Sequence, residues 1–164
     1  MGLLALGLGS NLGNRLANLR RAASRAAAAI GPVHRASDVF ETEPWGVTDQ
    51  PCFLNACMSL RTDAEPDDLL RIVKNIEREM GRKESARWGA RLIDLDLLLK
   101  DELVLDTPYL VIPHLHLPLR DFVLVPLMQI LPDWRHPLLK KAPSEMLAKL
   151  GPLSPTLRIA PLFP

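Results

Sequence analysis

Residues 92–99 read Leu-Ile-Asp-Leu-Asp-Leu-Leu-Leu, and this stretch decides the fold. Apolar residues alternate with Asp94 and Asp96, and a period of two is typical of a β-strand with one buried face. The alternation places the two carboxylates on one face of the strand, roughly 7 Å apart. The residues expected to enter the core from the other face are Ile93, Leu95, Leu97 and Leu99.

The segments before this strand alternate between strand and helix patterns. Short apolar or alternating runs predict the strands, and a period of 3.6 predicts the helices. Pro and Gly predict a loop at 43–52. The expected elements are a strand at 3–8, a helix capped by Asn11 or Asn14 and ended by Gly31-Pro32, strands at 33–42 and 53–61, and a helix from Asp63 and Pro66 to Gly81.

The order β-α-β-β-α-β predicts a ferredoxin-like α+β fold, in which helices pack on an antiparallel sheet. The composition changes from residue 108 onward, because 11 of the 15 prolines lie at 108 or later. This C-terminal extension is therefore expected to consist of loops and short helices, including 120–131 and 143–149, after a short strand at 103–105. We expect one domain over residues 1–164.

The formal net charge of +1 predicts no general attraction to nucleic acid or membrane. The longest apolar run is far shorter than the roughly 20 residues of a membrane span. Cys52 and Cys57 lack the spacing of a zinc site, and no signal peptide precedes the first strand, so we expect a cytoplasmic protein. The charges are nevertheless sorted, since a basic segment at 71–91 precedes an acidic one at 92–109.

Asp94 and Asp96 are candidate metal ligands. Two carboxylates at this separation suit a pair of Mg²⁺ ions roughly 3.5–4 Å apart, although solvated acids on a half-exposed strand are the alternative. The neighbouring basic residues favour the metal interpretation, because Arg forks bind phosphate oxygens and together the two groups suggest Mg-nucleotide. These bases are Arg78, Arg82, Lys83, Arg87 and Arg91, and Trp88 among them is a candidate for stacking or for burial at the sheet edge.

A proline-pinned segment at 113–122 adds His114, His116, Arg120 and Phe122. A neutral or protonated His114 beside Arg120 suits phosphate binding, and a structural His bonded to the backbone is the alternative. The His-x-His spacing alone does not predict zinc, because the nearest soft ligand is remote in sequence.

The glycine-rich stretch at 7–13 lacks the spacing of a dinucleotide fingerprint, and the chain has no P-loop motif. We interpret it as a tight strand-to-helix turn.

Residues 87–98, Arg-Trp-Gly-Ala-Arg-Leu-Ile-Asp-Leu-Asp-Leu-Leu, resemble the signature segment of the 6-hydroxymethyl-7,8-dihydropterin pyrophosphokinase family. The resemblance runs in order from about residue 4 to 133. The other matching segments are Gly9-Ser10-Asn11-Leu12, residues 42–46, Asp49-Gln50-Pro51, Leu54-Asn55-Ala56, Glu77, and Pro113-His114 followed by Arg120 and Phe122.

The resemblance implies a monomer that transfers pyrophosphate from ATP to 6-hydroxymethyl-7,8-dihydropterin in folate biosynthesis and releases AMP. It implies that Asp94 and Asp96 bind two Mg²⁺ ions and that Arg82 and Arg91 share in catalysis. The nucleotide-binding residues it implies are Glu77, Arg82, Trp88, Arg91, His114 and Arg120. The pterin-binding residues it implies are Thr42, Pro44, Trp45, Phe53, Asn55 and Phe122.

Phe53 and Asn55 also fall on the same mixed face of their expected strand, which suits a planar, amide-rich ligand. A γ-phosphate kinase or nucleotidyl transferase is the alternative enzyme. An RNA-binding module of the same fold is disfavoured, because the stacking aromatics it would need are not in the expected strand. A regulatory ATP- or metabolite-binding domain without turnover is the remaining alternative.

Overall fold

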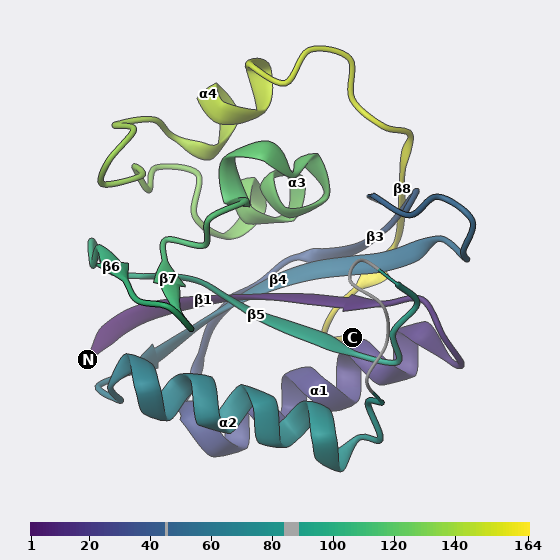
Figure 1. The fold of residues 1–164 in the computed structure, drawn as a ribbon, viewed down its shortest axis with the longest axis horizontal. Helices are drawn as coiled ribbons and strands as arrows, with labels where there is room; N and C mark the ends of the chain where they lie inside the picture. Colours follow the sequence, from purple (N-terminus) through teal and green to yellow (C-terminus); the bar gives the residue numbers. More distant parts are fainter. Residues whose placement is uncertain (45, 84–88) are drawn as a thin grey trace.

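The computed structural model describes residues 1–44, 46–83 and 89–164 (Figure 1). The strands are β1 (Gly2–Ser10), β2 (Val33–Ala36), β3 (Asp38–Thr42), β4 (Phe53–Thr62), β5 (Asp94–Lys100), β6 (Leu105–Asp106), β7 (Val111–Ile112) and β8 (Thr156–Pro161). The α-helices are α1 (Arg15–Ile30), α2 (Pro66–Glu79), α3 (Asp121–Ile130) and α4 (Pro143–Ala148), and a short 3₁₀ turn spans Leu117–Leu119.

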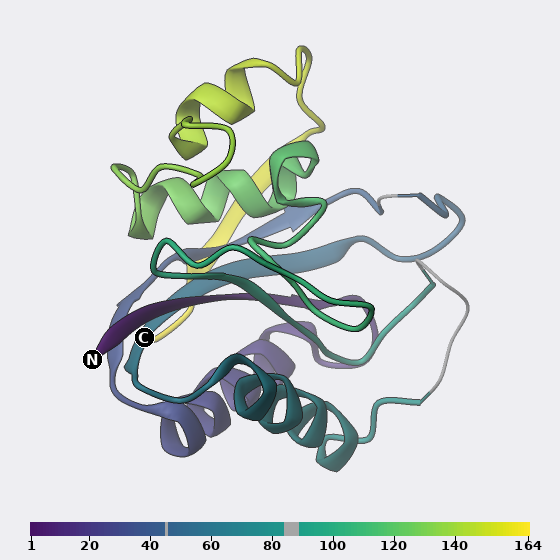
Figure 2. The ribbon, with the colours of Figure 1, turned by 60° about the vertical axis from the view of Figure 1, so that its left-hand side comes forward.

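The central sheet has the order β5-β1-β4-β3-β8, and β2 also pairs with β4. The pairs β1–β4, β1–β5 and β3–β4 are antiparallel, as the predicted ferredoxin-like plan requires. Figures 1 and 2 show α1 and α2 against one face of the sheet and α3 and α4 on the other side. The fold class predicted from the sequence is therefore confirmed.

Two apolar clusters fill the space on either side of the sheet. The larger one joins buried residues of α1 and α2, including Leu19 and Val73, to β1, β4 and β5. The smaller one joins Leu98 and Leu99 to α3 residues such as Leu124 and Leu127. None of the described helices is long and apolar enough to cross a membrane.

Local signals explain where the helices start and stop. The Asn14 side chain accepts the Ala17 N–H at 3.1 Å, so Asn14, rather than Asn11, caps α1. Pro66 occupies the first turn of α2, and Gly81 follows its end with a φ of +89°, a conformation that glycine adopts readily. α3 and α4 fall close to the helices predicted at 120–131 and 143–149.

Three expectations about strands need correction. The strand predicted at 33–42 is divided at Ser37, where the Ser37 hydroxyl accepts the Cys57 N–H at 2.9 Å. The strand predicted at 103–105 lies at Leu105–Asp106 and pairs with β7. The C-terminal extension holds a strand, β8, in addition to the predicted loops and helices, because β3 offers it a free edge to pair with.

The alternation along β5 holds only as far as Leu98. The register shifts there, so that Leu6 faces Leu97 and Ala5 faces Leu99. This bulge places Leu99 on the α3 side of the sheet together with Leu98, whereas Leu95 and Leu97 pack toward α1 and α2. All four predicted core residues are buried, but Leu99 enters a different cluster from Leu95.

Candidate active site

A pocket of about 260 Å³ opens above the face of the sheet that carries Asp94 and Asp96. Four adjacent strands, β5, β1, β4 and β3, supply its floor, and the segment that leads into α3 supplies one wall. The residues predicted from the sequence that line it are Thr42, Phe53, Asn55, Arg91, Asp94, Asp96, His114, Arg120 and Phe122. The structure therefore brings together side chains from five separate parts of the chain.

Glycines in β1 make room for this pocket. Gly9 lies between Asn55 of β4 and Asp94 of β5, and Gly7 lies between Cys57 and Asp96. A Cβ at Gly9 would lie 3.1 Å from Asn55 Oδ1, which is tighter than an ordinary contact. The strand predicted at 3–8 includes Gly7 and in the structure extends through Gly9 to Ser10, so the strand-to-helix turn begins only at Asn11.

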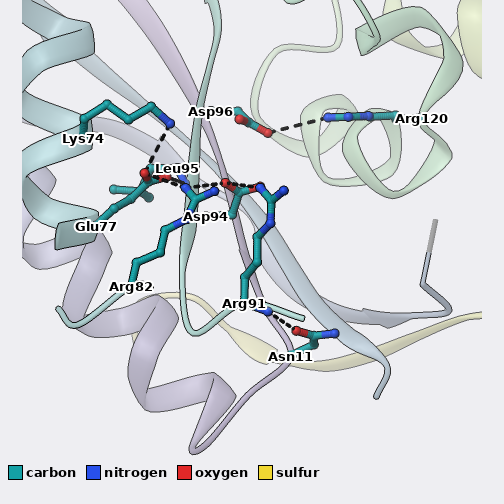
Figure 3. Close-up of polar contacts among 9 residues, drawn as sticks. All are labelled: Asn11, Lys74, Glu77, Arg82, Arg91, Asp94, Leu95, Asp96 and Arg120. Atoms are coloured by element: carbon teal, nitrogen blue, oxygen red, sulfur yellow. Dashed lines mark hydrogen bonds and ion pairs between the residues drawn. The ribbon is translucent and has the colours of Figure 1, made fainter. Parts of the chain in front are cut away.

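Asp94 lies between the guanidinium groups of Arg82 and Arg91 (Figure 3). Its Oδ1 lies 3.0 Å from Arg82 NH1 and 3.2 Å from Arg91 NH1. All three side chains are only partly exposed, so these pairs are less screened than pairs on an open surface. Acidic and basic residues predicted for metal and phosphate are thus in direct contact.

Glu77 lies beneath this cluster and does not line the pocket. Its side chain is 4% exposed, Oε1 accepts the Leu95 N–H at 2.8 Å, and Oε2 lies 2.6 Å from Arg82 NH1 and 3.2 Å from Lys74 Nζ. Because Leu95 stands between Asp94 and Asp96, Glu77 fixes the backbone that carries both carboxylates. In this structure it positions other residues of the site.

Asp96 is the second carboxylate of the pocket. It forms an ion pair with Arg120, whose NH1 lies 3.6 Å from Asp96 Oδ2. Burial, followed by repulsion from Asp94, raises the pKa of Asp96 to about 7, and Arg120 opposes the shift. Two carboxylates that resist joint ionisation form a place where added positive charge is favourable.

His114 projects from the proline-pinned segment into the same pocket. Burial, and then the positive Arg120, lower the pKa of His114 to about 4. Its Nδ1 accepts the His116 N–H at 3.1 Å, which leaves the proton of the neutral ring on Nε2. The His114 N–H itself donates to Leu98 O at 2.8 Å and ties this segment to β5. His114 therefore presents a neutral donor.

The opposite end of the pocket is aromatic and amide-bearing. Phe53 and Phe122 both line it, and Asn55 Nδ2 donates to Thr42 Oγ1 at 2.6 Å. Asn55 is 7% exposed, so this bond fixes the orientation of its amide. Pro44 is not among the lining residues.

Trp45 and Trp88 lie outside the described residues, as does Arg87 of the basic segment.

A second cavity of about 320 Å³ adjoins the first and shares Asp96, His114 and His116 with it. Its other walls are largely apolar. The remaining residues that line it come from α2, β5 and the segment around β7, namely Leu70, Val73, Lys74, Leu95, Leu97, residues 107–111 and Leu115. Sequence reasoning missed this cavity, although Leu70, Val73 and Lys74 share a helix face at spacings of three and four.

A ferredoxin-like sheet that carries paired carboxylates among arginines, at the junction of two cavities, defines a protein that handles phosphate groups. Residues 5–132 match the family described as 7,8-dihydro-6-hydroxymethylpterin-pyrophosphokinase (HPPK). The chain belongs to this family.

Relatives and solved structures agree with this family. The chain is 38% identical over 141 residues to the 2-amino-4-hydroxy-6-hydroxymethyldihydropteridine pyrophosphokinase of Aquifex aeolicus, which covers 86% of this chain and 88% of the relative. It is 44% identical over 130 residues to the enzyme of that name from Methylorubrum extorquens, with 78% and 82% covered. A Plasmodium falciparum HPPK-DHPS triple mutant has a TM-score of 0.75 at 16% identity, and an HPPK-DHPS in complex with substrates has 0.73 at 15%.

These structures share the fold over 90% of this chain, which spans 41% and 43% of their lengths. The activity is the one predicted, transfer of pyrophosphate from ATP to 6-hydroxymethyl-7,8-dihydropterin in folate biosynthesis.

Proposed function

We propose that ATP enters as its Mg²⁺ complex and that the two substrates occupy the two adjoining cavities. The observation that carries this proposal is that the cavities meet at Asp96, His114 and His116. Substrates bound on either side of this junction would bring the phosphate chain and the pterin hydroxymethyl group together. Holding two reactants in line supplies much of the rate in phosphoryl-type transfer.

The pterin is assigned to the first cavity. Phe53 and Phe122 would contact the two faces of its ring, and the fixed Asn55 amide and Thr42 would hydrogen-bond its edge. Pro44 and the backbone at Trp45 are proposed to complete the contacts with the edge of the pterin ring.

The nucleoside end of ATP is assigned to the second cavity, whose apolar walls suit a base. Its phosphates would then reach the arginine side of the junction. Arg82, Arg91 and Arg120 are proposed to bind phosphate oxygens through their forks, and His114 through its Nε2–H. Trp88 is proposed to bind the nucleotide, and Glu77 is proposed to support nucleotide binding through Arg82 and the Leu95 backbone.

Asp94 and Asp96 fit a divalent cation. Both are oxygen donors that line one pocket, and burial together with repulsion from Asp94 raises the pKa of Asp96, so a bound cation would stabilise its ionised form. The described residues contain no cluster of three or more His, Cys, Asp or Glu side chains able to hold a metal, so phosphates and water would complete the shell of two Mg²⁺ ions. Bound Mg²⁺ would neutralise phosphate charge and lower the pKa of the attacking hydroxyl.

The residues of this chain act mainly by position and charge. Arg82 and Arg91 already lie at Asp94, so the pocket holds positive charge where phosphate oxygens would arrive. His114 is neutral and donates a hydrogen bond without competing for a proton at pH 7. Preorganised donors of this kind stabilise charge that develops in the transition state.

Product analysis tests the proposal. With Mg²⁺, ATP and 6-hydroxymethyl-7,8-dihydropterin, AMP and the pterin diphosphate should form in equal amounts, and chelation of Mg²⁺ should stop the reaction. ADP or free pyrophosphate as the main product, or full turnover with chelator present, would contradict it.

We further propose that residues 1–164 form one pyrophosphokinase domain that works as a monomer in the cytoplasm. Cys52 and Cys57 are both free thiols, as is usual in a reducing compartment. Light scattering at micromolar concentration should give a mass near 18.2 kDa.

A further inference from the structure

Asn11 joins the two sides of the active site through one side-chain amide. It follows β1 directly and is 2% exposed. Its Oδ1 accepts the Arg91 N–H at 2.7 Å, and its own N–H donates to Arg91 O at 3.0 Å. Its Nδ2 donates to Gln50 Oε1 and to Pro51 O, both at 3.0 Å. The amide is therefore bonded to two segments about 40 residues apart in the chain.

These two segments carry residues of opposite ends of the site. Arg91 reaches Asp94 at 3.2 Å on the phosphate side, as Figure 3 shows together with its bond to Asn11. Pro51 stands two residues before Phe53, which lines the proposed pterin cavity. A path of two backbone residues, hydrogen bonds and one ion pair thus leads from Phe53 through Pro51, Asn11 and Arg91 to Asp94.

We infer that Asn11 is a positioning residue that couples pterin binding to nucleotide binding. This inference rests on the proposed function. A ligand that orders one segment leaves less conformational freedom for the other segment to lose, because one buried amide fixes both. Each substrate should therefore tighten the binding of the other by the same factor.

The substitution Asn11→Asp should break the bonds of Asn11 to Gln50 and Pro51 while keeping its bond to the Arg91 N–H. The carboxylate keeps the acceptor for the Arg91 N–H and nearly the same volume. It loses both donors, and its second oxygen would face the acceptors Gln50 Oε1 and Pro51 O, a repulsive arrangement. The connection to the phosphate side would persist while the connection to the pterin side breaks.

Calorimetric titration with α,β-methylene-ATP and Mg²⁺ measures the coupling, because this analogue cannot transfer pyrophosphate. Its Kd is determined with and without saturating 6-hydroxymethyl-7,8-dihydropterin. We expect the pterin to lower the Kd by at least about fivefold in the wild type and by less than about twofold in Asn11→Asp. The Kd of the analogue alone should change little, and a residue that only supported the fold would not produce this split.

Asn18→Ala is the matched control. Asn18 Nδ2 donates to Leu12 O at 2.9 Å and to Leu92 O at 3.3 Å, so it ties the same turn to the phosphate side without reaching Gln50 or Pro51. This variant should keep the wild-type coupling. Gln50→Ala removes the acceptor for Asn11 Nδ2, and with it the Gln50 Nε2 bond to Val47 O at 2.6 Å, at a less buried position. It should reduce the coupling even if Asn11→Asp does not fold.

Three results would overturn the inference. They are a wild type that binds both ligands without coupling, full coupling in both Asn11→Asp and Gln50→Ala, and loss of coupling in Asn18→Ala. A wild type that binds neither ligand would overturn the proposed function and the inference together, so the two failures are distinguishable.

Discussion

Asp96 lines the active site, and its burial there makes its ionised form destabilise the folded protein. Its raised pKa means that the folded protein binds a proton more readily than the unfolded chain, so ionisation of Asp96 lowers the stability of the ligand-free protein as pH rises from about 4 to 7. The site keeps this carboxyl despite its cost, which is typical of a residue retained for chemistry.

Replacing Asp96 should therefore separate activity from stability. Asp96→Asn is expected to lower pyrophosphate transfer by more than about 100-fold and to raise the melting temperature at pH 8. Asp94→Asn should lower transfer similarly without a gain in stability, because Arg82 and Arg91 would lose their shared carboxylate. Coupled AMP assays and thermal unfolding measure both. Wild-type turnover in either variant would contradict the metal role.

The contribution of His114 to stability should change with pH in the opposite direction to that of Asp96. Its folded pKa of about 4 lies below the ordinary 6.5, so the unfolded chain binds the proton first and stability is lost as pH falls from about 6.5 to 4. NMR titration should show a neutral ring throughout pH 5 to 8, and His114→Gln should remove its part of the stability loss. A His114 midpoint near 6.5 would disprove the assignment.

At the scale of elements, β8 joins the edge of the sheet to α1. It pairs with β3, whose last residue, Thr42, lines the pocket, and its end is held by α1. Arg20 donates to Pro161 O at 3.0 Å and to Leu162 O at 3.1 Å, and the Leu162 side chain is fully buried.

Loss of the Arg20 hydrogen bonds to Pro161 O and Leu162 O should destabilise the fold. Arg20→Ala is expected to lower the free energy of unfolding by about 1.5–3 kcal/mol, since two carbonyls would lose a charged donor. Urea denaturation measures the change, with Arg21→Ala on the exposed face of the same helix as the control. Equal stability of the two variants would show that Arg20 contributes nothing.

The elements differ in how far local sequence decides them. The strand at Asp94 and the helix from Pro66 to Gly81 were predictable, because periodicity and terminal signals act within a few residues. β8 was missed, since prolines bracket it and its pairing with β3 is a contact across more than 110 residues. The division at Ser37 depends on its bond to Cys57, which no local pattern reveals.

The same distinction holds for the site. Asp94 and Asp96 were found because a period of two places them on one face of their strand. Phe53 and Asn55 were implied by the family resemblance, and the period of two along their own strand agrees with it. The second cavity was not found, because its walls come from α2, β5 and the segment around β7, which only the folded chain brings together. The bridging role of Asn11 was hidden for the same reason, although the position itself was noted as part of a matching segment.

Across the whole molecule, the sheet ends in β5 on one side and β8 on the other. The outward groups of β5 are occupied in part, since Glu77 accepts the Leu95 N–H and the His114 N–H donates to Leu98 O. An edge strand with free backbone groups is a template for pairing with another chain, and prolines beside β8 discourage such pairing. Glu77 and His114 thereby leave fewer backbone groups on the β5 edge with which another chain could pair.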